Sequence, residues 1–276
     1  MSPPGSSPRN PIRLPAGLRF LAGVEFGRKI GLCEMIFGAA LARNGICWVR
    51  TAPGPIWKLD LGNPTHRWIV YGSYEGPSLW RWLKAHAASV NTVVDSGANI
   101  GQTVLYFATY LPEARIFAYE PGRNARLWLE EGVAANEFSR VTVVPKGLSN
   151  QAGSSRLASE GGSELHGAWN KVNPSEGEAI ELVALDAEIE RLGIAQVDLW
   201  KLDVEGHELE ALKGADRSLA ARRIRAISLE LGDAKSESAA FLKRHGYNGW
   251  DLGNSGRPKP LGKHTPWGNA LFLPPS

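Results

Sequence analysis

Sulfur-containing residues and long apolar runs are both scarce in this sequence. Its 276 residues include 2 cysteines and 2 methionines. Cys33 and Cys47 alone cannot build a disulfide framework or a cysteine-rich metal site, so we expect free thiols and a reducing, cytoplasmic compartment. The partly apolar stretch over residues 18–41 is interrupted by charges such as Arg28 and Glu34. A membrane span tolerates such charges poorly, so we expect no integral membrane segment.

An excess of charge of one sign is also absent. The chain has 31 Lys and Arg residues against 28 Asp and Glu residues, a net charge of +3. The densest basic run, Arg222-Arg223-Ile224-Arg225, fits a strand edge or a helix end better than a nucleic-acid-binding patch, so no nucleic-acid partner is expected. The 43% hydrophobic content is sufficient for the core of one domain of about 200 residues with an N-terminal extension.

The first 87 residues differ in pattern from the rest of the chain. Proline, serine and arginine without apolar periodicity predict a disordered tail over residues 1–17. Residues 18–87 predict a helix followed by a small antiparallel sheet, with strands at Ile46–Arg50, Ile56–Leu61 and Arg67–Tyr71. The helical segment would pack on the main domain, on a second copy in a homo-oligomer, or on a membrane surface, in that order of preference. The main domain is expected over residues 88–276.

The most informative stretch is the run from Val93 to Gln102. A strand leads into Asp95, glycines follow at Gly97 and Gly101, and an apolar helix pattern begins at Val104. Glycine lets a ligand approach the main chain, and the start of a helix presents free N–H groups. A carboxylate at the head of this turn disfavours a polyanion. It suits a ligand with ammonium and hydroxyl groups, such as S-adenosylmethionine (SAM).

Acidic residues recur at the ends of the predicted strands that follow. The strands expected in the main domain end at or next to Asp95, Glu120, Val144, Asp203 and Glu230. Ligands of open α/β sheets bind beyond the carboxyl ends of the strands, and an acid at the second strand tip can hold two ribose hydroxyls. The pattern predicts an α/β, Rossmann-like, doubly wound and mostly parallel sheet. A closing antiparallel element is expected near the tail, with Asn248–Gly268 as the loop between its last strands.

Three motifs in this chain resemble the FkbM family of SAM-dependent methyltransferases. They are Asp95-Ser-Gly-Ala-Asn-Ile-Gly101, Tyr119-Glu120-Pro121 and Leu202-Asp-Val-Glu-Gly-His-Glu208, and the flanking segments Tyr74–Gly76 and Asn269–Phe272 also fit. The similarity extends over roughly residues 68–273, with Ser96 in place of the family's usual valine. It implies a class I methyltransferase that methylates a hydroxyl of a sugar, glycan or small-molecule natural product. It also implies SAM contacts at Asp95, Gly97, Asn99 and Glu120.

The strand ends and the resemblance together define a predicted site. SAM contacts are expected from Asp95, Gly97, Ala98, Asn99, Gly101, Glu120, Pro121, Gly147, Leu148 and Asp203, with Gly147 and Leu148 beside the adenine. The proton of an acceptor hydroxyl would go to Asp203 or His207, since a positioned base assists attack by a neutral alcohol. A magnesium-type ion on Asp203, Glu205 and Glu230 is a weaker alternative, because acids at strand ends also serve as cofactor anchors and helix caps. Glu205 is expected to cap the start of the following helix. We therefore expect no metal.

Two other functional classes remain open at this point. A nicotinamide-dependent oxidoreductase would also use a glycine turn and a ribose-binding acid, although the second close glycine is missing. A non-catalytic subunit with the same fold would not need its cofactor motifs. The Gly/Ser-rich stretch from Ser149 to Asn173 predicts an exposed, mobile loop that serves as a substrate lid or as irregular surface. The tryptophans Trp80, Trp82, Trp250 and Trp267 would pack in the core or line an acceptor pocket.

Overall fold

The centre of the molecule is a sheet of eight strands. We analysed a computed structural model that describes residues 6–51, 54–73, 77–159, 170–172, 175–231, 236–251, 259–261 and 268–275. The strand order is β14-β13-β15-β12-β11-β4-β5-β6. In chain order these strands are β4 (Thr92–Ser96), β5 (Arg115–Tyr119), β6 (Val141–Val144), β11 (Leu199–Leu202), β12 (Ile227–Leu231), β13 (Asn248–Asp251), β14 (Lys259–Pro260) and β15 (Gly268–Leu273).

The pairing within this sheet follows the predicted plan. Neighbours from β12 to β6 are parallel, whereas β15 and β13 add antiparallel strands at one edge. Val93, Phe117, Val143 and Leu202 all lie in this one sheet, which confirms the mostly parallel α/β fold. The predicted loop over Asn248–Gly268 is wrong at its start, where β13 forms, and most of its remaining residues lie outside the described part of the chain.

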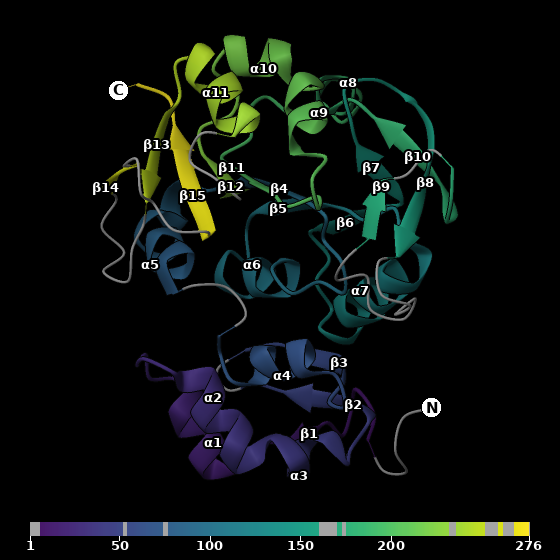
Figure 1. The fold of residues 1–276 in the computed structure, drawn as a ribbon, viewed down its shortest axis with the longest axis vertical. Helices are drawn as coiled ribbons and strands as arrows, with labels where there is room; N and C mark the ends of the chain where they lie inside the picture. Colours follow the sequence, from purple (N-terminus) through teal and green to yellow (C-terminus); the bar gives the residue numbers. More distant parts are fainter. Residues whose placement is uncertain are drawn as a thin grey trace.

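Helices cover both faces of the sheet (Figure 1). On one face pack α8 (Leu185–Arg191), α9 (Glu208–Lys213), α10 (Asp216–Ala220) and α11 (Glu237–Arg244). On the other pack α5 (Pro77–His86), α6 (Val104–Tyr110) and α7 (Arg123–Ala135), with the 3₁₀ turn η2 (Ala87–Ser89) after α5. Val94 belongs to the first core and Val93 to the second, because successive side chains of a strand point to opposite faces. A strand buried on both faces explains the nearly continuous apolar run before Asp95.

A second, four-stranded sheet lies beside the first. Its order is β7-β10-β8-β9, built from β7 (Lys146–Leu148), β8 (Gly153–Ser159), β9 (Asn170–Val172) and β10 (Glu178–Val183). The predicted mobile loop over Ser149–Asn173 is therefore wrong where β8 and β9 pair antiparallel with each other. Residues 160–169 of that stretch lie outside the described residues, as do Tyr74–Gly76 and Trp267.

The N-terminal extension combines a three-stranded sheet with short helices. The sheet has the order β1-β2-β3, from β1 (Ile12–Arg13), β2 (Ile46–Arg50) and β3 (Ile56–Asp60). The predicted helix is broken into α1 (Ala16–Ala22), α2 (Lys29–Cys33), the π-helix η1 (Glu34–Gly38) and α3 (Ala39–Ala42). Within the tail predicted to be disordered, β1 pairs with β2 and Leu14 is buried. The composition gave no sign of this, because the ordering comes from a distant strand.

The third strand predicted for the extension is wrong, since Arg67–Tyr71 falls on α4 (Pro64–Val70) and its C-cap. Asn63 caps this helix by accepting a hydrogen bond from the Thr65 N–H, and Pro64 opens it. Both are helix-start signals that the apolar run after them obscured. The extension shares one core with the main domain, in which Leu59 and Ile69 cluster with Leu105 and Trp128.

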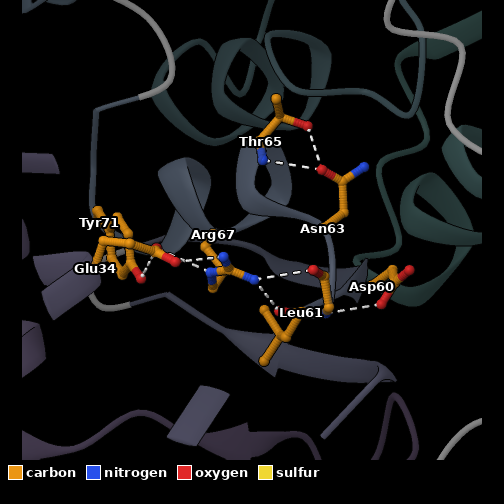
Figure 2. A network of polar contacts seen from close by, with 8 residues as sticks. Glu34, Asp60, Leu61, Asn63, Thr65, Arg67 and Tyr71 are labelled. Carbon is orange, nitrogen blue, oxygen red and sulfur yellow. Dashed lines mark hydrogen bonds and ion pairs between the residues drawn. The ribbon is translucent and has the colours of Figure 1, made fainter. Parts of the chain in front are cut away.

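A network of hydrogen bonds connects η1 with α4 in the extension (Figure 2). The guanidinium of Arg67 donates hydrogen bonds to the carboxylate of Glu34 on η1 and to the carbonyl oxygens of Leu61 and Gly62. The Tyr71 hydroxyl also donates to Glu34, at 2.7 Å. A side-chain carbon on Gly38 would lie 2.6 Å from a Glu34 carboxylate oxygen, so this glycine leaves room for the inward-turned acid.

Candidate active site

A pocket opens at the carboxyl ends of β4, β5, β7 and β11. Its empty space, counted out to the open mouth, is about 750 Å³. Eight residues of the predicted site line it: Gly97, Asn99, Glu120, Pro121, Gly147, Leu148, Asp203 and His207. Leu157 and Val172, from the stretch interpreted as a substrate lid or irregular surface, also line it. The lining is completed by residues that the sequence did not suggest: Gln102, Thr103, Leu182, Lys201, Val204 and, in another role, Glu205. The tryptophans of the described residues do not take part in this lining.

The turn after β4 lines the pocket on one side and contacts the end of β11 on the other. Gly97 has φ +76°, and a side-chain carbon there would lie 1.8 Å from the carbonyl oxygen of Asp203. The N–H groups of Gly97 and Ala98 donate to the Tyr119 carbonyl at the end of β5. Glycine is therefore required because two strand ends meet here, in addition to any need of a ligand.

Two of the predicted contact residues, Ala98 and Gly101, do not line the pocket. Ala98 is buried. Gly101 has φ +94°, and a side-chain carbon on it would lie 2.8 Å from Leu129 on α7, so this glycine allows the turn to pack against that helix. The helix itself begins at Val104, where the apolar pattern predicted it.

Asp95 is also absent from the pocket wall, because it is completely buried beneath the turn. The Thr103 hydroxyl donates to its Oδ2, whereas Oδ1 has no hydrogen-bond partner among the described residues. Burial raises the pKa of Asp95 to about 6, although the Lys201 ammonium and the Thr103 hydroxyl oppose the rise. A carboxyl held this way orders the floor of the pocket.

Glu120 lies at the tip of β5 with both carboxylate oxygens held by the main chain. The N–H of Asn99 donates to Oε2 and the N–H of Gly122 donates to Oε1, each at 2.7 Å. Burial nevertheless raises the pKa of Glu120 to about 7. Asn99, whose φ is +49°, has a buried Oδ1 that lacks a partner among the described residues. Because each carboxylate oxygen has a second lone pair, Glu120 can still accept two hydroxyl donors from the pocket.

A buried charge cluster occupies the end of β11. Lys201, almost completely buried, places Nζ 2.9 Å from Asp203 Oδ2. Burial alone would raise the pKa of Asp203, but Lys201 and a hydrogen bond from Glu230 outweigh it and hold that pKa below its ordinary value. Burial and the charge of Asp203 raise the pKa of Glu230 to about 8. At neutral pH the Glu230 carboxyl is therefore protonated, and its O–H donates a hydrogen bond to the Asp203 carboxylate.

The sequence did contain a signal for Lys201. It is the one charged residue inside the otherwise apolar strand Leu199–Leu202, and an unpaired lysine is rarely buried in a sheet. Its position two residues before Asp203 places both side chains on the same side of the strand.

His207 lies at the mouth of the pocket, just before α9 rather than on it. The helix begins at Glu208, and His207 Nε2 lies 2.9 Å from the Ser149 hydroxyl oxygen. Burial lowers the pKa of His207, so the imidazole is neutral at pH 7. The helix cap expected from Glu205 is not formed, because α9 has no side-chain hydrogen bond at its N-cap His207. Glu208 Oε1 instead accepts the N–H groups of Val204 and Gly206 in the turn before the helix. Glu205 instead adopts φ +52° and lines the pocket.

The described residues contain no group of three or more His, Cys, Asp or Glu side chains arranged to hold a metal ion. In the same part of the chain, every helix is too short or too polar to cross a bilayer. Cys33 and Cys47 are both free and buried.

Comparison with known proteins identifies related chains. The family model described as the methyltransferase FkbM domain matches residues 95–248, more than half of the chain. Methyltransferase sdnD of Sordaria araneosa is 32% identical over 158 residues, which are 45% of this chain and 60% of sdnD. Hexuronic acid methyltransferase AglP of Haloferax volcanii is 30% identical over 141 residues, which are 50% of this chain and 56% of AglP. The matches thus span less than two thirds of either relative.

Solved structures show weaker likeness. The human methyltransferase 10 domain containing protein is 17% identical, with a TM-score of 0.41 over 94% of this chain and 95% of that chain. Similarity at this level adds no functional information.

Proposed function

The chain belongs to the FkbM methyltransferase family, and we propose that it transfers a methyl group from SAM to an oxygen of a sugar or small-molecule natural product. The observation that carries the proposal is the pocket at the carboxyl edge of the sheet, which the buried Glu120 carboxylate lines together with the turn after β4 and Asp203 at the end of β11. A nicotinamide oxidoreductase and a non-catalytic subunit are the alternatives that the experiments below must exclude.

The residues of the pocket fit SAM. Glu120 would accept the two ribose hydroxyls, because its oxygens keep lone pairs beyond the two main-chain N–H groups. The buried Oδ1 of Asn99 lacks a partner among the described residues and would accept a donor of the ligand, such as its ammonium group. Gly147 and Leu148 would flank the adenine, with Pro121 on the same wall. Asp95, Ala98 and Gly101 would act indirectly, by holding the turn.

The chemistry that SAM supplies when bound is an electrophilic methyl group on a sulfonium. The chain must hold the acceptor oxygen in line and take its proton. Asp203 is a poor base, because Lys201 and the proton of Glu230 already stabilise its charge. We therefore assign proton acceptance to His207, in the tautomer whose Nε2–H donates to Ser149 and leaves the Nδ1 lone pair for the acceptor. Asp203 would keep a role in the electrostatics of the reacting centre.

The oxygen acceptor is supported by the chemistry of a relative. AglP is named a hexuronic acid methyltransferase, and a hexuronic acid offers only hydroxyl and carboxylate oxygens as nucleophiles. A sugar or sugar-like acceptor also suits a pocket whose outer wall combines Leu157 and Val172 with polar strand-end residues.

Calorimetric titration of the protein with SAM and with NAD is the first test. We expect SAM to bind with one site per chain and NAD to give no heat of binding. Binding of NAD alone would establish the oxidoreductase alternative, and binding of neither would refute an assignment that depends on the intact pocket.

A second test separates the acceptor chemistry from cofactor binding. With an acceptor found by screening hexuronic acids and related sugars, His207→Gln should lower kcat by about 10²–10⁴-fold and leave the Kd for SAM unchanged. A loss of less than tenfold would contradict the base assignment. Turnover that survives a chelator would support the expected absence of a metal, and turnover abolished by it would refute that expectation.

A further inference from the structure

The helical part of the extension, residues 16–42, presents an unusually apolar surface. Phe20 and Met35 are 71% and 77% exposed, and Val24 and Ile36 are also exposed. Among the described residues, the remaining exposed large hydrophobic side chain is Leu127 on α7. Soluble monomers rarely expose several large apolar side chains on one element, and such clusters mark interaction surfaces. We call these helices the N-terminal hairpin.

The packing of the hairpin brings together two segments that carry exposed apolar side chains. A side-chain carbon on Gly17 would lie 3.7 Å from the Phe37 ring, so α1 packs directly against η1. Phe20 follows Gly17 by about one helical turn, and Ile36 precedes Phe37 by one residue. Figure 1 shows α1 and α2 next to each other at one end of the long axis, away from the helices that cover the sheet.

The acidic residues of the hairpin are engaged by cations. Glu34 accepts hydrogen bonds from Arg67 and Tyr71, and Glu25 forms an ion pair with Lys29. The buried Lys29 ammonium also donates to the carbonyl oxygens of Ala22 and Gly72. These contacts pair the charge of both acids, although their side chains remain partly exposed, and leave Arg19 and Arg28 as the exposed cations of the hairpin.

Residues 16–42 contain three basic residues against Glu25 and Glu34, a net charge of +1, and further arginines lie on either side of them in the sequence. The first 50 residues contain seven basic residues and two glutamates, a net charge of +5, whereas the whole chain carries +3. Six of the basic residues are exposed arginines: Arg9, Arg13, Arg19, Arg28, Arg43 and Arg50. Exposed apolar side chains together with exposed arginines are the composition of helices that lie in a membrane interface, with the apolar groups among the acyl chains and the arginines at anionic headgroups.

We propose that the N-terminal hairpin docks this protein on the surface of an anionic lipid bilayer. Charge decides between this partner and a second copy of the chain. A symmetric dimer through the hairpin would bring two surfaces of the same positive charge together, which opposes association. An anionic bilayer meets the same surface with opposite charge and accepts the apolar side chains. This inference is independent of the methyl acceptor.

Co-sedimentation of the full chain with lipid vesicles tests the proposal. Vesicles of phosphatidylcholine alone and of phosphatidylcholine with phosphatidylglycerol are compared at low and high salt. We expect binding to the anionic vesicles that weakens with salt and little binding to the neutral ones. The triple variant Phe20→Ser/Met35→Ser/Ile36→Ser should bind at least tenfold more weakly. Leu127→Ser, an exposed apolar residue elsewhere, is the matched control and should bind as the wild type does.

A charge variant tests the second component of the surface. Arg19→Gln/Arg28→Asn should weaken anionic-vesicle binding by roughly 25-fold, from about fivefold for each arginine near a charged surface. Asparagine is chosen for Arg28 because its φ of +59° suits that residue. Arg244→Gln on α11 is the charge control. Thermal unfolding of each variant verifies the fold.

Three outcomes would overturn the proposal. The first is a wild type that anionic vesicles do not retain, and the second is a triple variant that binds them as strongly as the wild type. A wild-type dimer in analytical ultracentrifugation that the triple variant abolishes, without vesicle binding, would assign the hairpin to a second copy instead.

Discussion

The position of Glu120 makes the affinity for SAM depend on pH. Burial raises the pKa of this carboxyl to about 7, against the opposing effect of two main-chain N–H groups. Ribose hydroxyls donate to the ionised form, so the ionised fraction sets the apparent affinity. That fraction is about one tenth at pH 6 and about nine tenths at pH 8, and the apparent Kd should therefore be about tenfold weaker at pH 6.

Glu120→Gln is the perturbation that isolates this effect. Glutamine keeps the shape and one acceptor oxygen, but its amide NH₂ must face the N–H of Asn99 or Gly122. One buried donor then loses its acceptor, and the charge-assisted bonds to the ribose are lost. We expect SAM binding at pH 8 to weaken by about 1.5–3 kcal/mol, which is roughly 10–150-fold. The Glu120 contribution to the pH dependence should disappear.

Isothermal titration at pH 6, 7 and 8 measures both quantities. Glu178→Gln is the matched control, because the Glu178 carboxylate also accepts a main-chain N–H, from Arg123, but is exposed outside the pocket. SAM has its own titrating amine, so the relevant quantity is the difference in slope between wild type and variant. Equal slopes for wild type and Glu120→Gln would refute the assignment of the ribose to Glu120.

Three further outcomes are expected. Gly97→Ala should lower the free energy of unfolding, measured by urea denaturation, by at least about 3 kcal/mol, because φ is +76° and the new carbon would lie 1.8 Å from the Asp203 carbonyl oxygen. An unchanged urea midpoint would contradict this geometry of the turn. Glu34→Gln should cost about 1–3 kcal/mol in the same assay, since Arg67 keeps a buried charge whereas Glu34 is partly exposed; a neutral effect would argue against the network. The pKa of Glu230 is raised to about 8, so the folded state binds the Glu230 proton more tightly than the unfolded chain does. The contribution of this proton to the stability of the fold is therefore complete below about pH 4.5 and is lost as the pH rises through 8. Glu230→Gln mimics the protonated form and should flatten thermal stability between pH 6 and 9; an unchanged profile would contradict the shared proton.

Local pattern in the sequence was enough to predict the centre of this protein. Apolar runs ending in Asp95, Glu120, Asp203 and Glu230 mark the parallel strands, because a strand covered on both faces must be apolar and its polar tip must reach solvent or ligand. The order of the motifs then gave the fold and the family, which the strand topology and the family model confirm. The contact residues predicted for SAM remain a prediction.

Tertiary contacts decided the features that no short stretch encodes. The run Arg67–Tyr71 reads as a strand, yet the cap and the buried contacts of Arg67 make it helical. Gly97 reads as a site for a ligand, yet its conformation is also required by a carbonyl 106 residues later in the chain. The proton on Glu230 and the low pKa of Asp203 exist only because β11 and β12 pair in register and Lys201 is buried between neighbouring strands. Such properties depend on burial and on charges from other strands, and a linear sequence contains neither until the chain has folded.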